Sequence, residues 1–192
     1  MNLRFRPIEE LAGGDEHRVA LLEPGLLIKW PRSTARVFAK GSEVITTHLS
    51  LLRSLEVSMP TTQVLESPEI ILPTGVVRVP YCMITTQIQG RHLKRPDLAR
   101  PEVRNDLRGV IRASKALEPK GLSLDLFGAR TVVKILDPTR TLGNNLMVDD
   151  KGLYLVDPSL RVLNEGSIKE LIAMRVRTSL QHALGDLLLS IN

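Results

Sequence analysis

The first 90 residues carry their apolar positions in short runs separated by turn residues, a pattern typical of β-strands. Residues 19–22 and 26–30 flank a Glu-Pro-Gly turn, which predicts a hairpin. Two more strands are expected at 69–72 and 76–88, on either side of a Pro-Thr-Gly turn. This half of the chain is therefore predicted to be mainly β-sheet.

Apolar residues recur with helical spacing in three segments. Residues 42–55 and 101–117 form two of them, and the second begins at a proline, which suits a first helical turn. The third segment begins at Ser167 and Glu170, which have the spacing of a capping box. The positions expected to be buried are Ile45, Leu49, Leu52 and Leu55; Val103, Leu107, Val110, Ile111 and Leu117; and Leu171, Ile172, Val176, Leu180 and Leu184.

A basic segment bounded by prolines, residues 91–100, is predicted to link a first part, residues 1–90, to a second, residues 91–192. The second part holds a further predicted hairpin, with strands at 145–148 and 153–156 around an Asp-Asp-Lys-Gly turn. Strands gathered in one part, with helices mainly in the other, predict the α+β class.

Composition adds a constraint on the core and a suggestion about partners. The chain has 192 residues, 43% of them hydrophobic, which suffices for one compact domain or two small lobes. Aromatic residues make up 3%, so the core must be aliphatic. The net charge of +5 fits an acidic partner such as a nucleotide, nucleic acid or an anionic surface, and it fits a solvated basic face equally well.

Cys82 is the only cysteine, so an internal disulfide is excluded and so is a metal site built from cysteines. Its apolar neighbours predict a core strand position and not a nucleophile. The four histidines lack metal-ligand spacing and are expected at the surface or at caps. No apolar run has the length of a membrane span, so a cytoplasmic location is expected.

Several residues with a possible role in binding a nucleotide occur in order along the first part. Gly13 and Gly14 precede the first hairpin, and a glycine turn lets the backbone approach phosphates because it has no Cβ. Lys29 lies on the second strand of that hairpin among apolar residues. A charge in such a place needs a partner, and Glu43 at the start of the next helix is the expected one.

Asn145 and Asp157 frame the hairpin of the second part. Their oxygens are hard ligands at the two ends of a short hairpin, so they are expected to converge on one cation. Mg²⁺ is the cation expected, since it takes few protein ligands and fills its other positions with phosphate oxygens and water. Taken singly, Asn and Asp are also common turn residues, so the order of all these features is what points to a nucleotide site.

With these residues in this order, the chain resembles the protein-kinase-like superfamily over roughly residues 10–160, and its small bacterial and aminoglycoside-phosphotransferase branches most. The motifs are Leu11-Ala-Gly-Gly14 for the phosphate-covering loop, Leu27-Ile-Lys-Trp30 for the lysine strand, Gly143-Asn-Asn-Leu-Met-Val148 for the metal-binding Asn, and Leu155-Val-Asp-Pro158 for the metal-binding Asp. The resemblance implies a bilobal fold, with a β-rich N-lobe plus one helix and a reduced helical C-lobe. It also implies ATP and Mg²⁺ as cofactors.

The chain departs from the family pattern at the catalytic base. The family places an Asp five residues before the metal-binding Asn, and that position here is Arg140. Asp125 and Asp137 are the alternatives. Asp125 is chosen because it follows the predicted helix where the chain should enter the site, which makes residues 127–143 an insertion. Asp137 precedes a proline and is expected to cap a surface turn.

Three functions therefore remain open from the sequence. The first is an ATP- and Mg²⁺-dependent phosphotransferase acting on a non-peptide acceptor, since few residues follow Asp157 to hold a peptide. The second is a pseudokinase, the same fold used as a nucleotide-binding or regulatory module. The third is a basic nucleic-acid-binding protein, although no nucleic-acid motif is present. A row of arginines at positions 100, 104, 108 and 112 also suits an acidic protein partner, or a solvated helix face.

Overall fold

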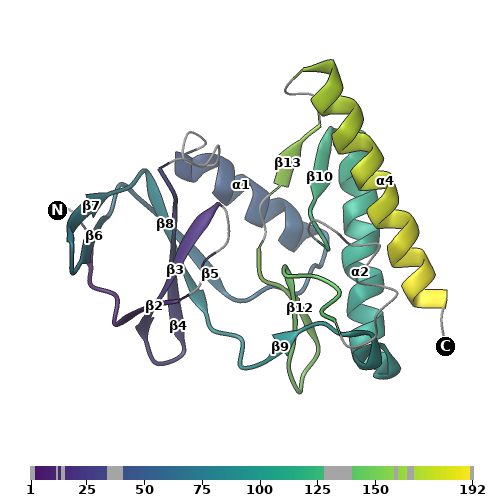
Figure 1. Cartoon of the computed structure of the whole chain (residues 1–192), viewed down its shortest axis with the longest axis horizontal. Coiled ribbons are helices and arrows are strands. Elements are labelled where there is room, and N and C mark those ends of the chain that lie inside the picture. Colours follow the sequence, from purple (N-terminus) through teal and green to yellow (C-terminus); the bar gives the residue numbers. More distant parts are fainter. Residues whose placement is uncertain are drawn as a thin grey trace. The chain divides into compact units, whose positions relative to one another are not determined.

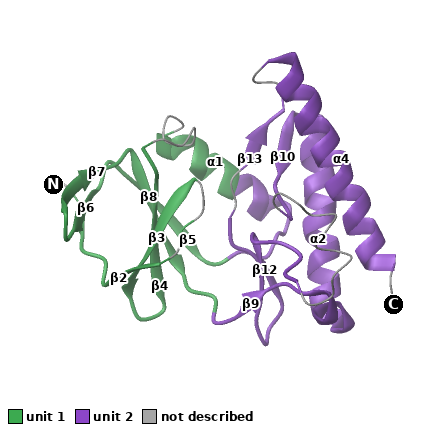
Figure 2. Cartoon of the chain, in the orientation of Figure 1, with its two compact units in different colours: residues 1–49, 60–88 green, residues 50–59, 89–192 purple. Residues whose placement is uncertain are grey.

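A computed structural model describes residues 3–11, 13, 16–33, 41–127, 140–157, 160–163 and 167–190. It contains several β-sheets together with long helices, which confirms the α+β class. The chain forms two compact units: unit 1 comprises residues 1–49 and 60–88, and unit 2 comprises residues 50–59 and 89–192 (Figure 2). The roles expected for residues 1–90 and 91–192 stay predictions.

Unit 1 is built on a five-stranded antiparallel sheet (Figure 1). Its strands, in spatial order, are β2 (Glu9–Leu11), β3 (His17–Glu23), β4 (Leu26–Pro31), β8 (Tyr81–Thr86) and β5 (Thr62–Glu66). The predicted first hairpin is confirmed as β3 and β4, with Gly25 in its turn at a φ of 84° that favours glycine. A smaller sheet contains β1 (Arg4–Phe5), β6 (Glu69–Leu72) and β7 (Gly75–Arg78).

The strand predicted at 76–88 is wrong as a single element. The structure has two strands there, β7 in the small sheet and β8 in the large one, separated by Val79 and Pro80. Pro80 has no N–H to donate to a neighbouring strand, and its carbonyl accepts a hydrogen bond from the Ser67 backbone instead. The chain therefore changes sheets at this proline.

The core of unit 1 follows the alternation of its central strands. Ile28 and Trp30 on β4 are fully buried, and Lys29 between them points to the opposite face of the sheet. Cys82 on β8 lies in the same core, and its burial raises the pKa of the thiol to about 12. The prediction that Cys82 is a core residue is confirmed.

Helix α1 (Gly41–Ser54) confirms the first predicted helix. Ile45, Leu49 and Leu52 are buried on it, as the spacing predicted, and Leu55 just beyond its end is half-buried. Its first part counts with unit 1 and its last turn with unit 2. No helix in the described part of the chain has both the length and the apolar content to cross a membrane.

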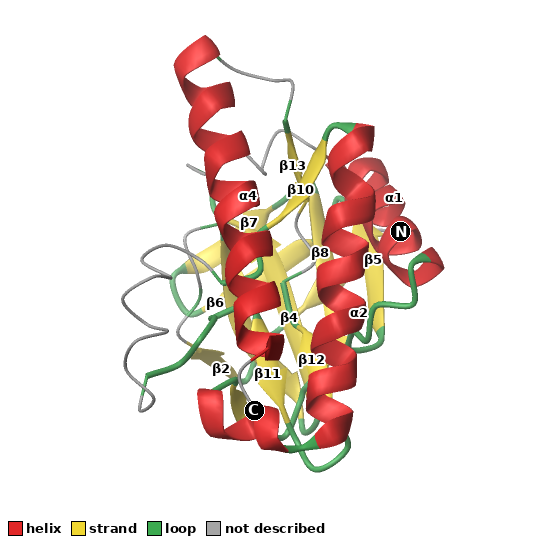
Figure 3. Cartoon of the chain, turned by 90° about the vertical axis from the view of Figure 1, so that its right-hand side faces the viewer, coloured by secondary structure: helices red, strands yellow, loops and turns green. Residues whose placement is uncertain are grey.

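Unit 2 contains two long helices, α2 (Pro101–Leu117) and α4 (Ile168–Ser190), which lie side by side and antiparallel (Figures 1 and 3). A 3₁₀ turn, η3 (Glu118–Lys120), follows α2. The described strands of unit 2 form two small antiparallel sheets. One contains β12 (Leu153–Leu155), β11 (Leu146–Val148) and β9 (Arg91–His92), and the other contains β10 (Leu122–Leu124) and β13 (Leu160–Val162). The hairpin predicted around residue 150 is confirmed as β11 and β12.

The segment predicted as a linker, residues 91–100, is instead an integral part of unit 2. It contains β9 and the 3₁₀ helix η2 (Arg95–Ala99), with Leu93 and Leu98 in the core. The Asp97 carboxylate is buried, where it accepts hydrogen bonds from the Arg91 guanidinium and the Lys94 backbone N–H. Basic charges bounded by prolines are typical of a solvated linker. In the structure, however, Arg91 is paired with the buried Asp97 of the same unit.

The two helices of unit 2 differ in how well their buried faces were predicted. On α2, Val103, Leu107, Val110, Ile111 and Leu117 are all buried, as expected. On α4, the prediction for Ile172, Val176 and Leu180 is wrong, since these side chains are exposed, and Leu171 and Leu184 are only half-buried. The buried residues of α4 are Thr178, Gln181, His182, Gly185 and Leu188.

Candidate functional site

The β11–β12 hairpin brings Asn145 and Asp157 to the same end of a two-stranded ladder. Leu146 pairs with Leu155, and the Val156 backbone N–H donates to the Asn145 carbonyl at 2.9 Å. Asn145 therefore lies opposite the residue that precedes Asp157, and both side chains are half-buried. The hairpin thus places the two predicted metal ligands at the same end of its two strands.

Asp125 joins this end of the hairpin through Asn145. Asp125 follows β10 directly, and the Asn145 side-chain amide donates to its backbone carbonyl at 2.6 Å. Gly143 packs on the same segment, since a Cβ added there would lie 2.7 Å from the Leu126 carbonyl oxygen. The two ends of the predicted insertion therefore meet. Asp137, the alternative base, lies outside the described residues.

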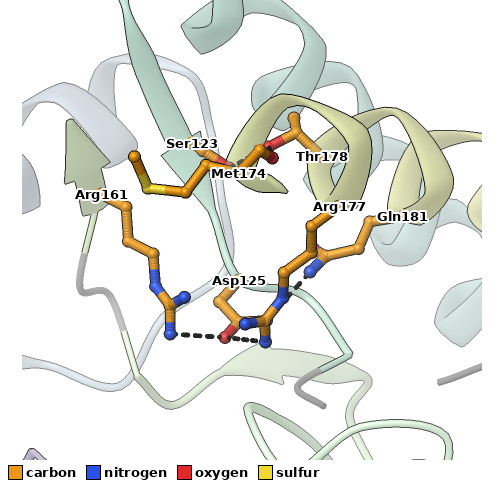
Figure 4. Close-up of a pocket in the computed structure, with 7 residues that line it drawn as sticks. All are labelled: Ser123, Asp125, Arg161, Met174, Arg177, Thr178 and Gln181. Atoms are coloured by element: carbon orange, nitrogen blue, oxygen red, sulfur yellow. Dashed lines mark hydrogen bonds and ion pairs between the residues drawn. The ribbon is translucent and has the colours of Figure 1, made fainter. Parts of the chain in front are cut away.

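The carboxylate of Asp125 is surrounded by cationic and amide donors (Figure 4). The guanidiniums of Arg161 and Arg177 both reach its Oδ2 atom, at 3.1 and 2.8 Å, and the Gln181 amide reaches Oδ1 at 3.0 Å. A carboxylate oxygen has about two lone pairs, so both on Oδ2 are engaged. Asp125 must exchange a partner before this oxygen can take a proton.

Helix α4 fixes the position of Asp125 through a row of polar side chains. Gln181 accepts a hydrogen bond from the Leu126 backbone N–H at 2.9 Å while it donates to the Asp125 carboxylate. Thr178 lies 2.7 Å from the Ser123 hydroxyl and donates to the Met174 carbonyl of its own helix. Residues 123–126 are thereby held against α4 along their whole length.

Arg161, Arg177 and Gln181 were not found by reasoning from the sequence. Their partner, Asp125, is 36 to 56 residues away, and nothing in a local pattern encodes such a pairing. The available signal was on α4, where Arg177, Thr178 and Gln181 put three polar residues on one face of the helix. A polar row of this kind marks either a solvated face or a set of buried hydrogen bonds.

The candidates of unit 1 lie on the elements expected for them. Lys29 is half-buried in the centre of the sheet, paired with Val19 on β3 and Met83 on β8. Glu43 is exposed in the first turn of α1. An ion pair between Lys29 and Glu43 stays a prediction.

Gly13 approaches the backbone of β3 too closely for a side chain. A Cβ at this position would lie 2.5 Å from the His17 carbonyl oxygen and 3.2 Å from the Val19 nitrogen. Glycine is therefore required there by the fold itself, whatever its role toward a phosphate. Gly14 lies outside the described residues.

No protein-family model and no curated protein matches the chain. Among solved structures, the chain is similar to the Legionella pneumophila Lpg2603 kinase bound to IP6, with 14% sequence identity and a TM-score of 0.48. The match covers 88% of this chain and 56% of that one, so this chain spans little more than half the length of the kinase. A likeness this weak carries no information on substrate or ligand.

Proposed function

We propose that the protein is a reduced, bilobal kinase-like phosphotransferase that uses ATP and Mg²⁺ to phosphorylate a non-peptide acceptor. One observation supports this above the others: the hydrogen bond from the Asn145 amide to the Asp125 carbonyl. It joins a candidate base to a candidate metal ligand across a twenty-residue separation. Asp157 is the next residue after Val156, whose backbone N–H donates to the Asn145 carbonyl.

The donor atoms at the end of the hairpin fit a magnesium ion. The Asn145 amide nitrogen is bonded to the Asp125 carbonyl, so the amide oxygen is the atom left to act as a ligand. Asp157 adds a carboxylate oxygen. Mg²⁺ prefers oxygen ligands and is commonly held by one or two protein groups plus phosphate oxygens. When bound, it would neutralise charge that develops on the phosphates of the nucleotide.

Lys29 is the proposed contact for the α- and β-phosphates, with Glu43 orienting its ammonium group. Gly13 and Gly14 are proposed to let the backbone cover the phosphates. These roles rest on the order of the residues and on the elements that carry them, since Lys29 lies in a central strand and Glu43 begins the helix that follows.

Asp125 is the proposed general base. It would accept the proton of the acceptor hydroxyl while that oxygen forms a bond to the γ-phosphorus. The bond between the γ-phosphorus and the β–γ bridging oxygen breaks at the same time, and ADP leaves. Asp125 suits this step through its place beside Asn145, and if Oδ2 is the atom that takes the proton, it must first lose one of its two arginine partners.

A pseudokinase is the second candidate, and the same carboxylate favours it. In the described state, Asp125 is engaged by two guanidiniums and one amide, as a purely structural ion pair would be. Arg140, at the position of the usual base, cannot accept a proton at physiological pH. The fold would then bind a nucleotide without transferring phosphate.

Two substitutions test the metal and base assignments. We expect Asp157→Ala to abolish Mg²⁺-dependent ATP binding, measured by calorimetry, with the thermal unfolding midpoint little changed. Asp150→Asn is the control, because Asp150 is an exposed carboxylate in the turn of the same hairpin. Unchanged ATP binding by Asp157→Ala would make the hairpin structural only.

Asp125→Asn should reduce Mg²⁺-dependent ATP turnover about 10²- to 10⁴-fold, the usual contribution of a general base. ATP affinity should change little. Asp137→Asn is the comparison, and loss of turnover in that variant alone would show that Asp137 is the base. ATP binding by the wild type without turnover on any acceptor would establish the pseudokinase.

A further inference from the structure

We propose that Arg161 and Arg177 form a binding site for a phosphate group carried by the acceptor. The presence of an anion site follows from the geometry around Asp125. The assignment of its anion to the acceptor rests on the proposed function. The ligand class is therefore a small molecule that carries both a free hydroxyl and a phosphomonoester.

Two arginines from different elements converge on one oxygen. Arg161 belongs to β13 and Arg177 to α4, and their Nη2 atoms lie 3.1 and 2.8 Å from the Asp125 Oδ2 atom (Figure 4). Among the described residues, two positive charges face one negative charge here, which leaves an excess of one positive charge. An anion is attracted to such an excess in a partly desolvated position.

The two guanidiniums also keep donors for a ligand. Each guanidinium has five N–H donors in a planar fork. In the described part of the chain, the hydrogen bonds of Arg161 and Arg177 go to Asp125 alone, one from each residue. Their side chains are 39% and 36% exposed, so neither arginine is sealed from solvent.

Each of the other polar side chains that line this pocket already has a hydrogen-bond partner. The Ser123 and Thr178 hydroxyls bond to each other, and Thr178 donates to the Met174 carbonyl. Gln181 uses its amide oxygen on the Leu126 N–H and its nitrogen on Asp125. Guanidinium groups thus supply most of the donors offered to a ligand, and paired guanidiniums favour phosphate, whose oxygens accept in the geometry of the fork.

The size of the pocket places the anion at its mouth. The pocket has a volume of about 10 Å³, which holds one water molecule at most. A phosphate group would lie against the exposed edges of Arg161 and Arg177, outside this space. The acceptor's hydroxyl would then lie near Asp125.

This site would also explain how Asp125 Oδ2, which is engaged by two arginines, becomes available as the base. A phosphate group bound by the remaining N–H groups would draw the guanidiniums toward the mouth of the pocket and away from Oδ2 of Asp125. Once one arginine turns to the phosphate, a lone pair of Oδ2 becomes available to the acceptor hydroxyl. Acceptor binding and base availability would be coupled through the two arginines.

Binding of inorganic phosphate tests the anion site without any need for turnover. Wild-type protein is titrated with inorganic phosphate and with glycerol 3-phosphate by calorimetry, at constant ionic strength. We expect saturable binding that weakens about tenfold or more in Arg161→Gln and in Arg177→Gln, a change that corresponds to about 1.4 kcal/mol. Arg175→Gln, which removes an exposed arginine from the same helix, should stay within about twofold of wild type.

Folding of each variant is checked by circular dichroism and thermal unfolding. If a glutamine variant does not fold, Arg161→Lys and Arg177→Lys replace it, because lysine keeps the charge and loses the fork; weaker phosphate binding is again the expected result. The proposal is overturned if wild type shows no saturable phosphate binding, or if the Arg175→Gln control loses as much affinity as the other two.

Turnover separates this inference from the proposed function. With Mg²⁺ and ATP, phosphate transfer is compared for glycerol and glycerol 3-phosphate, which differ only in the phosphate group. Arginine-dependent phosphate binding without transfer to either acceptor would keep the anion site and reject the phosphotransferase. Transfer that is insensitive to Arg161→Gln would keep the phosphotransferase and reject an acceptor phosphate at this site.

Discussion

Helices α2 and α4 lie side by side in unit 2, yet they are stabilised in different ways. Helix α2 buries a row of Val, Leu and Ile side chains against the sheets. Helix α4 turns Thr178, Gln181 and His182 inward and exposes Ile172, Val176 and Leu180. A helix whose polar face is the buried one serves more than packing, because each inward polar group must find a specific partner.

The partners of α4 are the residues around the candidate base. Arg177 and Gln181 hold the Asp125 carboxylate, and Thr178 holds Ser123. One turn further along, His182 lies 2.9 Å from the Ser114 hydroxyl of α2. The difference between the helices teaches that hydrophobic spacing identifies the helix that builds the core, whereas the helix that positions a site must be found from its polar face.

The largest expected effect is the difference in stability between two leucine truncations, one on each helix. Leu107→Ala on α2 removes a fully buried side chain and should lower the free energy of unfolding by about 2–5 kcal/mol. Leu180→Ala on α4 removes a side chain that is 50% exposed and should change it by no more than about 0.5 kcal/mol. Urea denaturation of both variants measures this; a similar loss in both would mean that the apolar face of α4 is covered after all.

Two helical glycines sharpen the comparison. A Cβ at Gly185 of α4 would lie 2.6 Å from Ile111 Cδ1, whereas a Cβ at Gly109 of α2 meets nothing within 4 Å. Gly109→Ala should therefore stabilise the protein by up to about 1 kcal/mol through helix propensity. Gly185→Ala should destabilise it by about 1–2 kcal/mol, because overcrowding at Ile111 outweighs that gain. Thermal unfolding midpoints that rise in both variants would show that α4 can move away from α2.

The smallest effect is a pH dependence at His182. Burial lowers the pKa of this imidazole, as does Lys115, while Glu118 and Asp186 act in the opposite direction. The folded state therefore resists protonation, and the unfolded state protonates near its ordinary pKa of about 6.5. Stability contributed by neutral His182 is present above that pH and is lost as the pH falls below it.

Unfolding free energies measured at pH 7.5 and 5.5 should thus fall more for wild type than for His182→Gln, which keeps a hydrogen-bonding side chain beside Ser114. The other histidines are the same in both proteins, so the difference between the two isolates His182. Equal losses in wild type and variant would contradict the assigned direction.

Local sequence patterns predicted the elements that are fixed by local rules. The β3–β4 and β11–β12 hairpins were found from turn residues, and α2 was found with its buried Val, Leu and Ile residues, because alternation, glycine turns and helical spacing act over a few positions. The same reasoning failed at Pro80, where the chain changes sheets. It also failed at residues 91–100, where the buried Asp97 carboxylate forms an ion pair with Arg91.

The candidate site was predicted in part for the same reason. Asn145 and Asp157 frame a hairpin, so their proximity follows from local structure. The contacts of Asp125 with Arg161 and Arg177 depend on how α4 and β13 return to β10. Tertiary packing decides such contacts, and charged residues on a helix give no local sign of a distant partner. His182 likewise was expected at the surface or at a cap, and its burial depends on α2.

The burial of Cys82 has a practical consequence for experiments with thiol-reactive labels. The only native thiol is fully buried in the core of unit 1, and its raised pKa leaves almost no thiolate at neutral pH. Maleimides and spin labels should therefore react only with introduced cysteines. A doubly labelled Gln63→Cys, Lys120→Cys protein, with one exposed site in each unit, would report by electron spin resonance how the distance between the units responds to nucleotide.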